Sequence, residues 1–237
     1  MKLTERANAG LHTHVEARIH QIAGDRTCRV LDVGAGTGAF LSRLKEGGFA
    51  CLKGIDIAVP ANRLEGIDFH AYDLDSGAMP FADGSFQVIV SIEVFEHIEN
   101  MGALLKELAR VLTHDGTILV TTPNIHSMEA RLRYLLTSKL KQFDELSDPT
   151  HIYPVSLFAF ERLLGRFGLK IEQRWGFPVD GSSPTSRRGL RLAARLLSAL
   201  GVRSPIAGDH LCMLIRRNQE SIGAAPRTKQ DLVASHY

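Results

Sequence analysis

Cysteine, tryptophan and long apolar runs are scarce in this sequence. The 237 residues contain three cysteines and one tryptophan. The odd number of cysteines argues against a disulfide framework. Their spacing, at Cys28, Cys51 and Cys212, is not that of metal ligands and argues against a zinc site. No apolar run approaches the roughly 20 residues that span a bilayer, and the first residues lack the apolar core of a signal peptide. These absences predict a cytoplasmic protein.

An excess of one charge is absent as well. The formal net charge is +2, so no overall field attracts nucleic acid or an anionic membrane. The basic residues are not interleaved with aromatic residues that could stack on bases, so nucleic acid is a weaker candidate partner. The 44% hydrophobic content is ordinary for a globular chain, and the length suits one α/β domain with additions.

Short apolar runs alternate with helical patterns through the first half of the sequence. The runs that predict strands cover residues 29–33, 51–57, 69–74, 86–92 and 117–121. The helical patterns cover residues 11–22, 37–46 and 104–112, the last one stopping at 114–116. This alternation predicts right-handed crossovers and a doubly wound, Rossmann-like α/β sheet with helices on both faces.

The pattern changes after residue 124. Apolar residues from Leu132 to Leu140 predict a helix followed by a loop, and Ser156 is a candidate N-cap for a helix that stops at Gly168. Runs at 170–177 and 210–215 predict two more strands. They are predicted to be antiparallel because no clear crossover helix separates them.

We predict a single domain over residues 1–217. Its additions are a helical cap at 1–24 and two insertions at 125–153 and 178–207. The polar, aperiodic residues 218–237 predict a disordered tail.

Gly34, Gly36 and Gly38 lie between a predicted strand and a predicted helix. Glycines there let the backbone turn tightly and approach a ligand, while the helix N-terminus offers free N–H groups. Two ligands compete for such a loop. With Ala39 as its last position, the loop matches the G-x-G-x-x-A pattern of dinucleotide-binding proteins. Asp56 then lies at the right distance downstream to bind a ribose.

Asp32, two residues before the first glycine, favours a different ligand. A carboxylate there repels a pyrophosphate but suits a cation. S-adenosylmethionine carries an ammonium and a sulfonium and has no phosphate. A structural role for Asp32 as a cap of the loop is the alternative.

With these residues, the sequence resembles the class I S-adenosylmethionine-dependent methyltransferases of the small-molecule type. The resemblance covers about Arg29 to Asn124, and the segment 30–38 is similar to the family's first motif. Asp56 matches the acidic residue that binds the ribose hydroxyls in the family. The pair Asp73 and Leu74 matches the family's adenine-contacting residues.

The segment 79–86 resembles the family's stretch before the fourth strand. One departure follows it, because Gln87 replaces the usual aspartate and puts a local hydrogen bond, but not the fold, in question. The resemblance also implies a seven-stranded sheet, mostly parallel, with an antiparallel last strand beside the fifth. The cofactor-binding residues that we predict are Asp32, Gly34, Ala35, Gly36, Asp56, Ile57, Asp73, Leu74 and Glu93.

Three polar residues, Glu93, Glu96 and His97, follow the predicted strand at 86–92. A helical turn there would place them on one face at the carboxyl edge of the sheet, where such folds bind ligands. Methyl transfer needs proximity, and a base only if the acceptor must lose a proton. We predict His97, His151 and Glu96 as catalytic residues.

A divalent metal is an alternative at the same place. Some relatives, the quinone-biosynthesis O-methyltransferases and small-RNA 2′-O-methyltransferases, resemble this sequence with a Glu-x-x-Glu-His metal site. The corresponding set here is Glu93, Glu96, His97 and His151, whose oxygen and imidazole donors suit such an ion. In other members Glu93 faces the cofactor and His97 anchors a loop or acts as a base. The metal is the less favoured interpretation.

The acceptor is expected to bind over the cofactor, between the first helix and the two insertions. Within residues 187–203, Arg187, Arg191 and Arg195 recur every four positions. The residues predicted on the opposite face are Leu190, Ala193, Ala194, Leu197 and Leu200. Such a basic amphipathic helix suits an anionic membrane surface or an acidic partner, although a solvated face on a packed helix explains it too. We predict a small-molecule, glycan or lipid-linked acceptor, anionic in character, with O-methylation favoured.

Two other functions stay open at this point. A non-catalytic S-adenosylmethionine-binding regulator or subunit would keep the glycine loop but lose the polar groups that Glu93, Glu96 and His97 provide. An NAD-dependent oxidoreductase would share the sheet, but Asp32 opposes it and the sequence has no Tyr-x-x-x-Lys pair.

Overall fold

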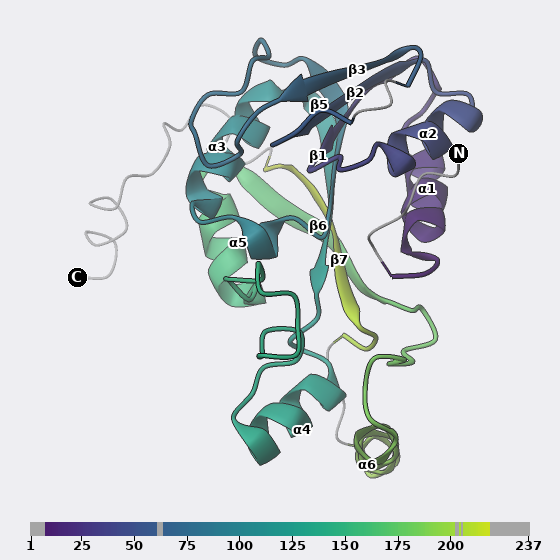
Figure 1. The fold of residues 1–237 in the computed structure, drawn as a ribbon, viewed down its shortest axis with the longest axis vertical. Helices are drawn as coiled ribbons and strands as arrows, with labels where there is room; N and C mark the ends of the chain where they lie inside the picture. The colour runs from purple at the N-terminus through teal and green to yellow at the C-terminus, as the bar shows by residue number, and fades with distance from the viewer. Residues whose placement is uncertain (1–7, 61–63, 202–203, 205, 219–237) are drawn as a thin grey trace, which may run out of the picture.

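A computed structural model describes residues 8–60, 64–201, 204 and 206–218 (Figure 1). The strands are β1 (Arg29–Val33), β2 (Cys51–Asp56), β3 (Ile67–Ala71), β4 (Phe86–Ile92), β5 (Leu112–Pro123), β6 (Leu169–Phe177) and β7 (His210–Arg217). The helices are α1 (Leu11–Ile22), α2 (Ala39–Glu46), the short 3₁₀ helix η1 (Phe95–His97), α3 (Met101–Val111), α4 (Met128–Thr137), α5 (Leu157–Arg166) and α6 (Arg188–Ala199).

The strands form one seven-stranded sheet in the order β3-β2-β1-β4-β5-β7-β6. The pairs among β1 to β5 are parallel, whereas β7 is antiparallel to both β5 and β6. The predicted fold class and the predicted antiparallel last strand are therefore confirmed. Because β7 runs backwards, its first residue, His210, pairs with the last residue of β5, Pro123. The start of β7 consequently lies at the same edge as the carboxyl ends of the parallel strands.

The sheet is covered on both faces (Figure 1). On one face, α1 and α2 pack on a cluster that includes Val30 of β1 and Val88 of β4. On the other, α3 and α5 pack on a cluster that includes Leu31 and Ile89, the next residues along the same strands. Successive side chains of a strand point to opposite faces, so a central strand buried on both sides is a continuous apolar run.

Several predicted boundaries shift by a few residues. The helix α2 begins at Ala39 because Gly38 has a left-handed backbone, with φ of 77°. The strand β3 ends at Ala71, since Asp73 opens a turn in which its carbonyl oxygen accepts from the Ser76 N–H. The helix α4 ends before Leu140, because Ser138 is left-handed with φ of 57°.

The end of α3 was predicted at 114–116, and this is wrong. The helix ends at Val111, and Leu112 already pairs with Phe86 of β4. The next pair joins Val88 to Thr117, so the residues between 112 and 117 form an irregularity within β5. The side chain of Leu112 is buried by this strand pairing, although its sequence spacing also fits the helix.

The two insertions form a lobe that projects below the sheet in Figure 1. We call α4, α6 and their flanking residues in 125–153, 178–201, 204 and 206–207 the lower lobe. The two helices contact each other, and Ser127 caps α4 by accepting from the Ala130 N–H. The predicted tail at 218–237 lies outside the described residues, apart from Asn218. In the described part of the chain, no helix combines the length and apolar character needed to cross a membrane.

Candidate active site

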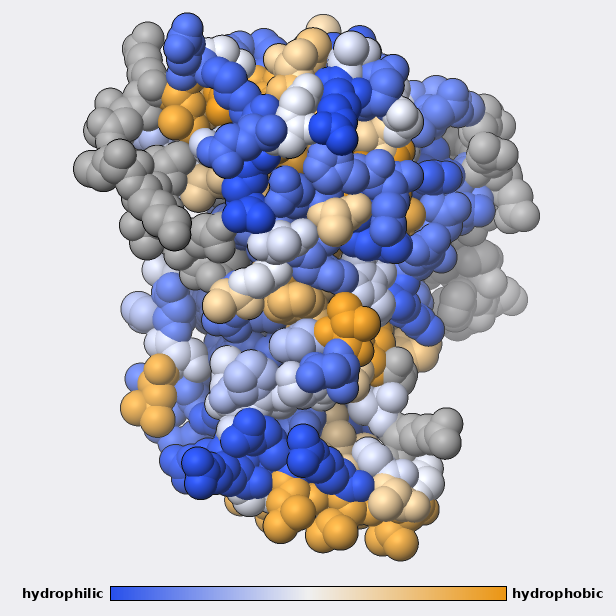
Figure 2. Space-filling view, turned by 90° about the vertical axis from the view of Figure 1, so that its right-hand side faces the viewer, coloured by the Kyte–Doolittle hydropathy of each residue, from blue (hydrophilic) through white to orange (hydrophobic). Residues whose placement is uncertain are grey.

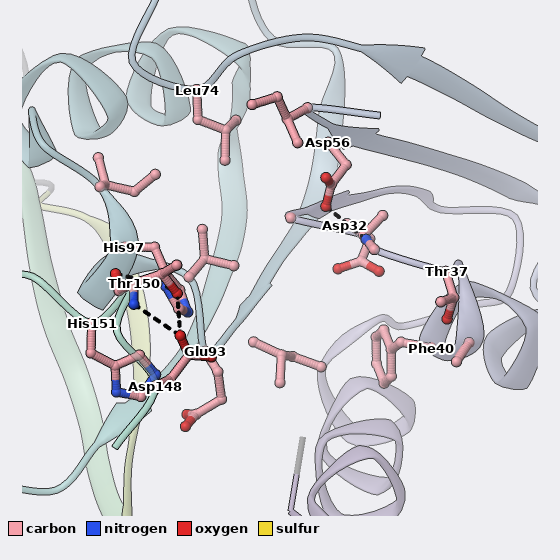
Figure 3. Close-up of a pocket in the computed structure, with 18 of the residues that line it drawn as sticks. Asp32, Thr37, Phe40, Asp56, Leu74, Glu93, His97, Asp148, Thr150 and His151 are labelled. Atoms are coloured by element: carbon pink, nitrogen blue, oxygen red, sulfur yellow. Dashed lines mark hydrogen bonds between the residues drawn. The ribbon is translucent and has the colours of Figure 1, made fainter. Parts of the chain in front are cut away.

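A cavity of about 590 Å³ opens at the carboxyl edge of the sheet (Figure 3). All nine residues predicted to bind the cofactor line it, and so do His97 and His151. Glu96 does not line it. The lining residues that the sequence did not single out include Asn8, His12, Thr37, Phe40, Asp75, Gln142, Asp148, Thr150 and His210.

The glycine loop is folded back onto β2. The N–H of Gly34 donates to the carbonyl oxygen of Ile55 at 2.8 Å, and the N–H of Gly36 donates to Oδ2 of Asp56 at 2.8 Å. Gly34 has φ of +74°, and a Cβ there would lie 2.4 Å from Cγ2 of Val94. This position therefore needs glycine for its backbone conformation and for the space it leaves.

Asp32 is a buried carboxyl at the wall of the cavity, with 3% of its surface exposed. Burial, together with the negative charge of Asp56, raises its pKa from 3.8 to about 8. The carboxyl consequently holds a proton at neutral pH while no cation is nearby. A cationic ligand in the cavity would favour the ionised form.

Asp56 is the last residue of β2, and Asp73 lies in the turn that follows the neighbouring strand β3. Figure 3 shows the carboxylate of Asp56 close to the glycine loop. Oδ1 of Asp73 accepts from the N–H of Asp75 at 3.0 Å, which fixes the turn that carries Leu74 into the cavity wall. Ile57 is 76% exposed and lies at the rim.

Glu93 is held in a left-handed backbone conformation, with φ of 53°, directly after β4. Its Oε1 accepts from Oγ1 of Thr121 at 2.9 Å, and its Oε2 lies 2.9 Å from Nδ1 of His210. A non-glycine residue in this region carries strain that the surrounding bonds must offset. The neighbouring strands β5 and β7 thus fix one carboxylate of the cavity wall.

His210 and Asn8 are functional candidates that the sequence did not reveal. The Asn8 Nδ2 donates to Nε2 of His210 at 2.7 Å, which leaves Nδ1–H of that ring to donate to Glu93. The signal for His210 was its position, since the first residue of an antiparallel last strand lies at the ligand-binding edge. Asn8 had no such signal, because it is 202 residues away from its partner in the sequence.

The rings of His97 and His151 contact each other in a T-shaped arrangement, with centroids 4.8 Å apart. Nδ1 of His97 lies 3.0 Å from the carbonyl oxygen of Thr150, and Nδ1 of His151 lies 2.7 Å from that of Gln142. A carbonyl oxygen only accepts, so Nδ1 carries the hydrogen in both rings. Burial lowers the pKa of His97, with a further contribution from His151, and outweighs the opposing bond to Thr150. Its Nε2 is therefore a free base at neutral pH.

Glu96 is fully buried next to the two histidines. Its Oε2 accepts from Oγ1 of Thr122 at 3.1 Å, whereas its Oε1 has no partner among the described residues. Burial, reinforced by the charge of Glu93, raises the pKa of Glu96 well above its usual value. The predicted single face for Glu93, Glu96 and His97 is wrong, because the chain forms η1 only from Phe95 and Glu93 precedes it with a left-handed backbone.

Three of the four predicted metal ligands come together. Glu96, His97 and His151 each offer one ligand atom, and these atoms lie within 4.8 Å of one another. Glu93 is not in this group, since its carboxylate is bonded to Thr121 and His210.

The chain is similar to known methyltransferases. A family model described as a methyltransferase domain matches residues 7–174. The uncharacterized methyltransferase YcgJ of Bacillus subtilis is 25% identical over 205 residues, covering 82% of this chain and 79% of that protein. A demethylmenaquinone methyltransferase of Tropheryma whipplei is 35% identical over 96 residues, 38% of this chain and 40% of the relative. A ubiquinone biosynthesis O-methyltransferase of Neisseria meningitidis is 30% identical over 105 residues, 40% of this chain and 44% of the relative.

Solved structures show the same fold. A S-adenosylmethionine-dependent methyltransferase from Archaeoglobus fulgidus superposes with a TM-score of 0.55 at 21% identity, covering 87% of this chain and 94% of that one. The 1,6-didemethyltoxoflavin-N1-methyltransferase of Burkholderia thailandensis, solved with S-adenosylhomocysteine bound, gives a TM-score of 0.56 at 15% identity. It covers 90% of this chain and 80% of that one.

Proposed function

We propose a methyl acceptor and a catalytic base for this chain, which belongs to the S-adenosylmethionine-dependent methyltransferases. The methyl group goes to an oxygen of a small-molecule or glycan acceptor, either free or lipid-linked. The observation that carries this proposal is the pair of imidazoles at the cavity, each of which has its Nδ1 bonded to a backbone carbonyl oxygen. A hydroxyl must lose a proton when it is methylated, and an imidazole can accept it.

The cofactor takes the glycine-loop side of the cavity. The carboxyls of Asp32 and Glu93 would hold the ammonium and sulfonium cations, and a cation beside Asp32 would favour its ionised form. Asp56 accepts hydrogen bonds from the ribose hydroxyls, and Asp73 with Leu74 contacts the adenine. The rest of the cofactor side of the cavity is lined by Gly34, Ala35, Gly36 and Ile57. The small residues among them leave room for the cofactor.

The acceptor takes the side of the cavity that η1 and the 142–151 loop line. As the acceptor oxygen forms its bond to the methyl carbon, the bond from sulfur to that carbon breaks and the hydroxyl proton passes to Nε2 of His151 or His97. Thr150 and Gln142 hold the two rings in the tautomer that this transfer requires. Two relatives whose names refer to quinones support an acceptor with an apolar tail, and one of them is named as an O-methyltransferase.

The experiment is turnover with isotopically labelled S-adenosylmethionine and a panel of hydroxylated acceptors. We expect His151→Gln or His97→Gln to lower kcat about 10²–10⁴-fold, the usual contribution of a general base, with unchanged affinity for S-adenosylhomocysteine by calorimetry. Protonation of the base should lower the kcat of the native protein at low pH. The residual kcat of the variants should not show this decrease. His114→Gln is the matched control, because His114 is 60% exposed and lies outside the cavity. Native kcat in both cavity variants, or a product methylated on nitrogen or carbon, would contradict the proposal.

A divalent metal ion is the second candidate for the same cluster. The unpartnered, buried Oε1 of Glu96 and the 4.8 Å grouping with His97 and His151 favour it. Two imidazole nitrogens and a carboxylate suit a borderline ion, which would supply Lewis-acid activation of the acceptor oxygen. Full turnover after chelation, with Glu96→Ala equally active, would exclude this ion. Loss of turnover on chelation, restored by added Mn²⁺ or Zn²⁺, would favour it over the simple base.

A further inference from the structure

The outer side of α6 is apolar where a solvated helix would be polar. Leu192, Leu196 and Leu200 recur at four-residue intervals and are 61%, 59% and 80% exposed. Among the apolar residues predicted opposite the arginines, Ala194 is buried, whereas Leu200 projects into solvent. Packing against α4 therefore does not account for the apolar side of this helix.

Arginines flank these leucines. Arg187, Arg188, Arg191 and Arg195 lie along α6 or at its start, and residues 181–208 contain no aspartate or glutamate. Within the described part of the chain, none of the four makes an ion pair, although Arg191 and Arg195 line a cavity that Glu129 and Asp180 also line. Three of the four lysines and arginines in the neighbouring insertion differ, because Arg133, Lys139 and Lys141 are each paired with a carboxylate.

The neighbouring helix α4 adds a second exposed apolar group. Tyr134, Leu135 and Leu136 at its end are 54%, 78% and 71% exposed. Because α4 and α6 contact each other, both groups belong to the end of the lower lobe. Figure 2 shows hydrophobic side chains gathered at that end, with a band of hydrophilic side chains directly above them. We call these six apolar residues, with the four arginines of α6, the basic-apolar tip.

We infer that the basic-apolar tip docks on the surface of an anionic lipid bilayer. Leucines that enter the boundary of the acyl chains contribute the apolar term, and the arginines beside them contribute attraction to anionic headgroups. Tyr134 contributes an aromatic ring that ends in a polar hydroxyl, and such side chains are typical of membrane interfaces. A second copy of this chain suits the tip less well, because two identical arginine rows would face each other and repel.

The position of the tip gives this docking a consequence for the cavity. The loop that leaves α4 carries Gln142, Thr150 and His151 into the cavity wall. Docking would hold this side of the cavity near the membrane, where a lipid-linked acceptor would be found. The inference itself rests on the surface residues alone and does not depend on the methyl acceptor.

The experiment is flotation of the whole protein with vesicles of phosphatidylglycerol and phosphatidylcholine, compared with phosphatidylcholine alone. We expect binding to the anionic vesicles only, weakened at high ionic strength. Each arginine near such a surface is worth about fivefold in partitioning, so Arg191→Gln with Arg195→Gln should weaken binding about 25-fold. Leu192→Ser with Leu196→Ser should weaken it at least about tenfold. The matched control is Lys106→Gln with Arg162→Gln, which removes two exposed charges from α3 and α5.

Several outcomes would overturn the inference. They are no flotation at low ionic strength, equal flotation with neutral vesicles, or an equal loss in the control pair. A dimer in sedimentation that Leu192→Ser with Leu196→Ser converts to a monomer would assign the tip to a second copy instead. Calorimetry with S-adenosylhomocysteine on the same variants separates this test from the proposed function, since tip variants should bind the cofactor product normally and vesicle binding needs no acceptor.

Discussion

The cavity region and the lower lobe are held in place by different interactions. Around the cavity, two apolar clusters join the sheet to its helices, with side chains such as Leu31 and Ile89 fully buried. The lower lobe is tied to the start of β7 by a buried polar network in which Lys141 pairs with Asp209. Apolar burial is shared among many contacts, whereas a buried ion pair depends on both of its partners. The lower lobe should therefore be the more sensitive to a single polar substitution.

The network joins both insertions to the sheet. Lys141 and Asp209 are 3% and 1% exposed, and Oδ2 of Asp209 accepts from the N–H and Oγ1 of Thr185 at 3.1 and 2.9 Å. Burial pushes the pKa of Asp209 upward, but the hydrogen bond and charge of Lys141, with Ser183, outweigh it and lower that pKa. A lowered pKa stabilises the fold above the pKa of the unfolded carboxyl, and this contribution is lost as the pH falls.

The largest expected effect comes from Lys141→Met, which leaves Asp209 buried without its partner. We expect the free energy of unfolding to fall by about 3–5 kcal/mol, measured by urea denaturation. Lys139→Met is the matched control in the same loop, because its pair with Glu145 is 49% and 65% exposed and should be worth less than about 1 kcal/mol. Equal losses in the two variants would show that the lower lobe does not depend on the buried pair.

The same contrast explains what could be predicted from the sequence. The bounds of β1 and β4 were predicted correctly because each strand is a mostly apolar segment that ends directly before a glycine or an acidic residue. The cofactor-side residues follow one motif order along consecutive strands, so the topology brings them together. The bond between His210 and Glu93 and the Lys141–Asp209 pair are contacts between distant segments, which no local pattern encodes. The predicted start of β5 was wrong because the position of Leu112 fits the apolar pattern of both a helix and a strand.

In the cavity region, the most sensitive position should be a backbone one. Gly34→Ala places a Cβ 2.4 Å from Cγ2 of Val94 at a residue with φ of +74°. We expect a loss of about 2–4 kcal/mol in unfolding free energy, from the left-handed backbone and the overlap together, with S-adenosylhomocysteine binding lost in calorimetry. Gly24→Ala is the control, because Gly24 has φ of +69° but nothing within 4 Å of the added Cβ. If the two variants lose equal stability, the contact with Val94 is unimportant.

Asp32→Asn should separate stability from binding. The folded protein keeps a proton on Asp32 up to about pH 8, while the unfolded carboxyl ionises near 3.8, so stability falls as the pH rises between these values. The variant should lose this slope and be more stable than the native protein at pH 8. It should also bind S-adenosylmethionine about ten- to hundredfold more weakly, because a charged partner is missing.

Proton uptake and release provide the second measurement on Asp32. Calorimetry in buffers of different ionisation enthalpy should show that the native protein releases a proton when S-adenosylmethionine binds at neutral pH, and that Asp32→Asn releases none. Proton release that persists in the variant would assign the ionisation to another group. The effect on binding would then have a cause other than the charge of Asp32.

The smallest effect is expected at Gln87, where the chain departs from the family's usual aspartate. Its Oε1 accepts from the backbone N–H of Arg29 at 2.8 Å, so the glutamine supplies a hydrogen bond to the first residue of β1. The bond is exposed and neutral, and Gln87→Ala should lower the unfolding free energy by about 1 kcal/mol or less. Gln87→Asp tests the reach of the side chain, since it is shorter by one methylene. A loss as large as that of Lys141→Met would contradict the view that the cavity region depends on shared apolar contacts instead of single polar bonds.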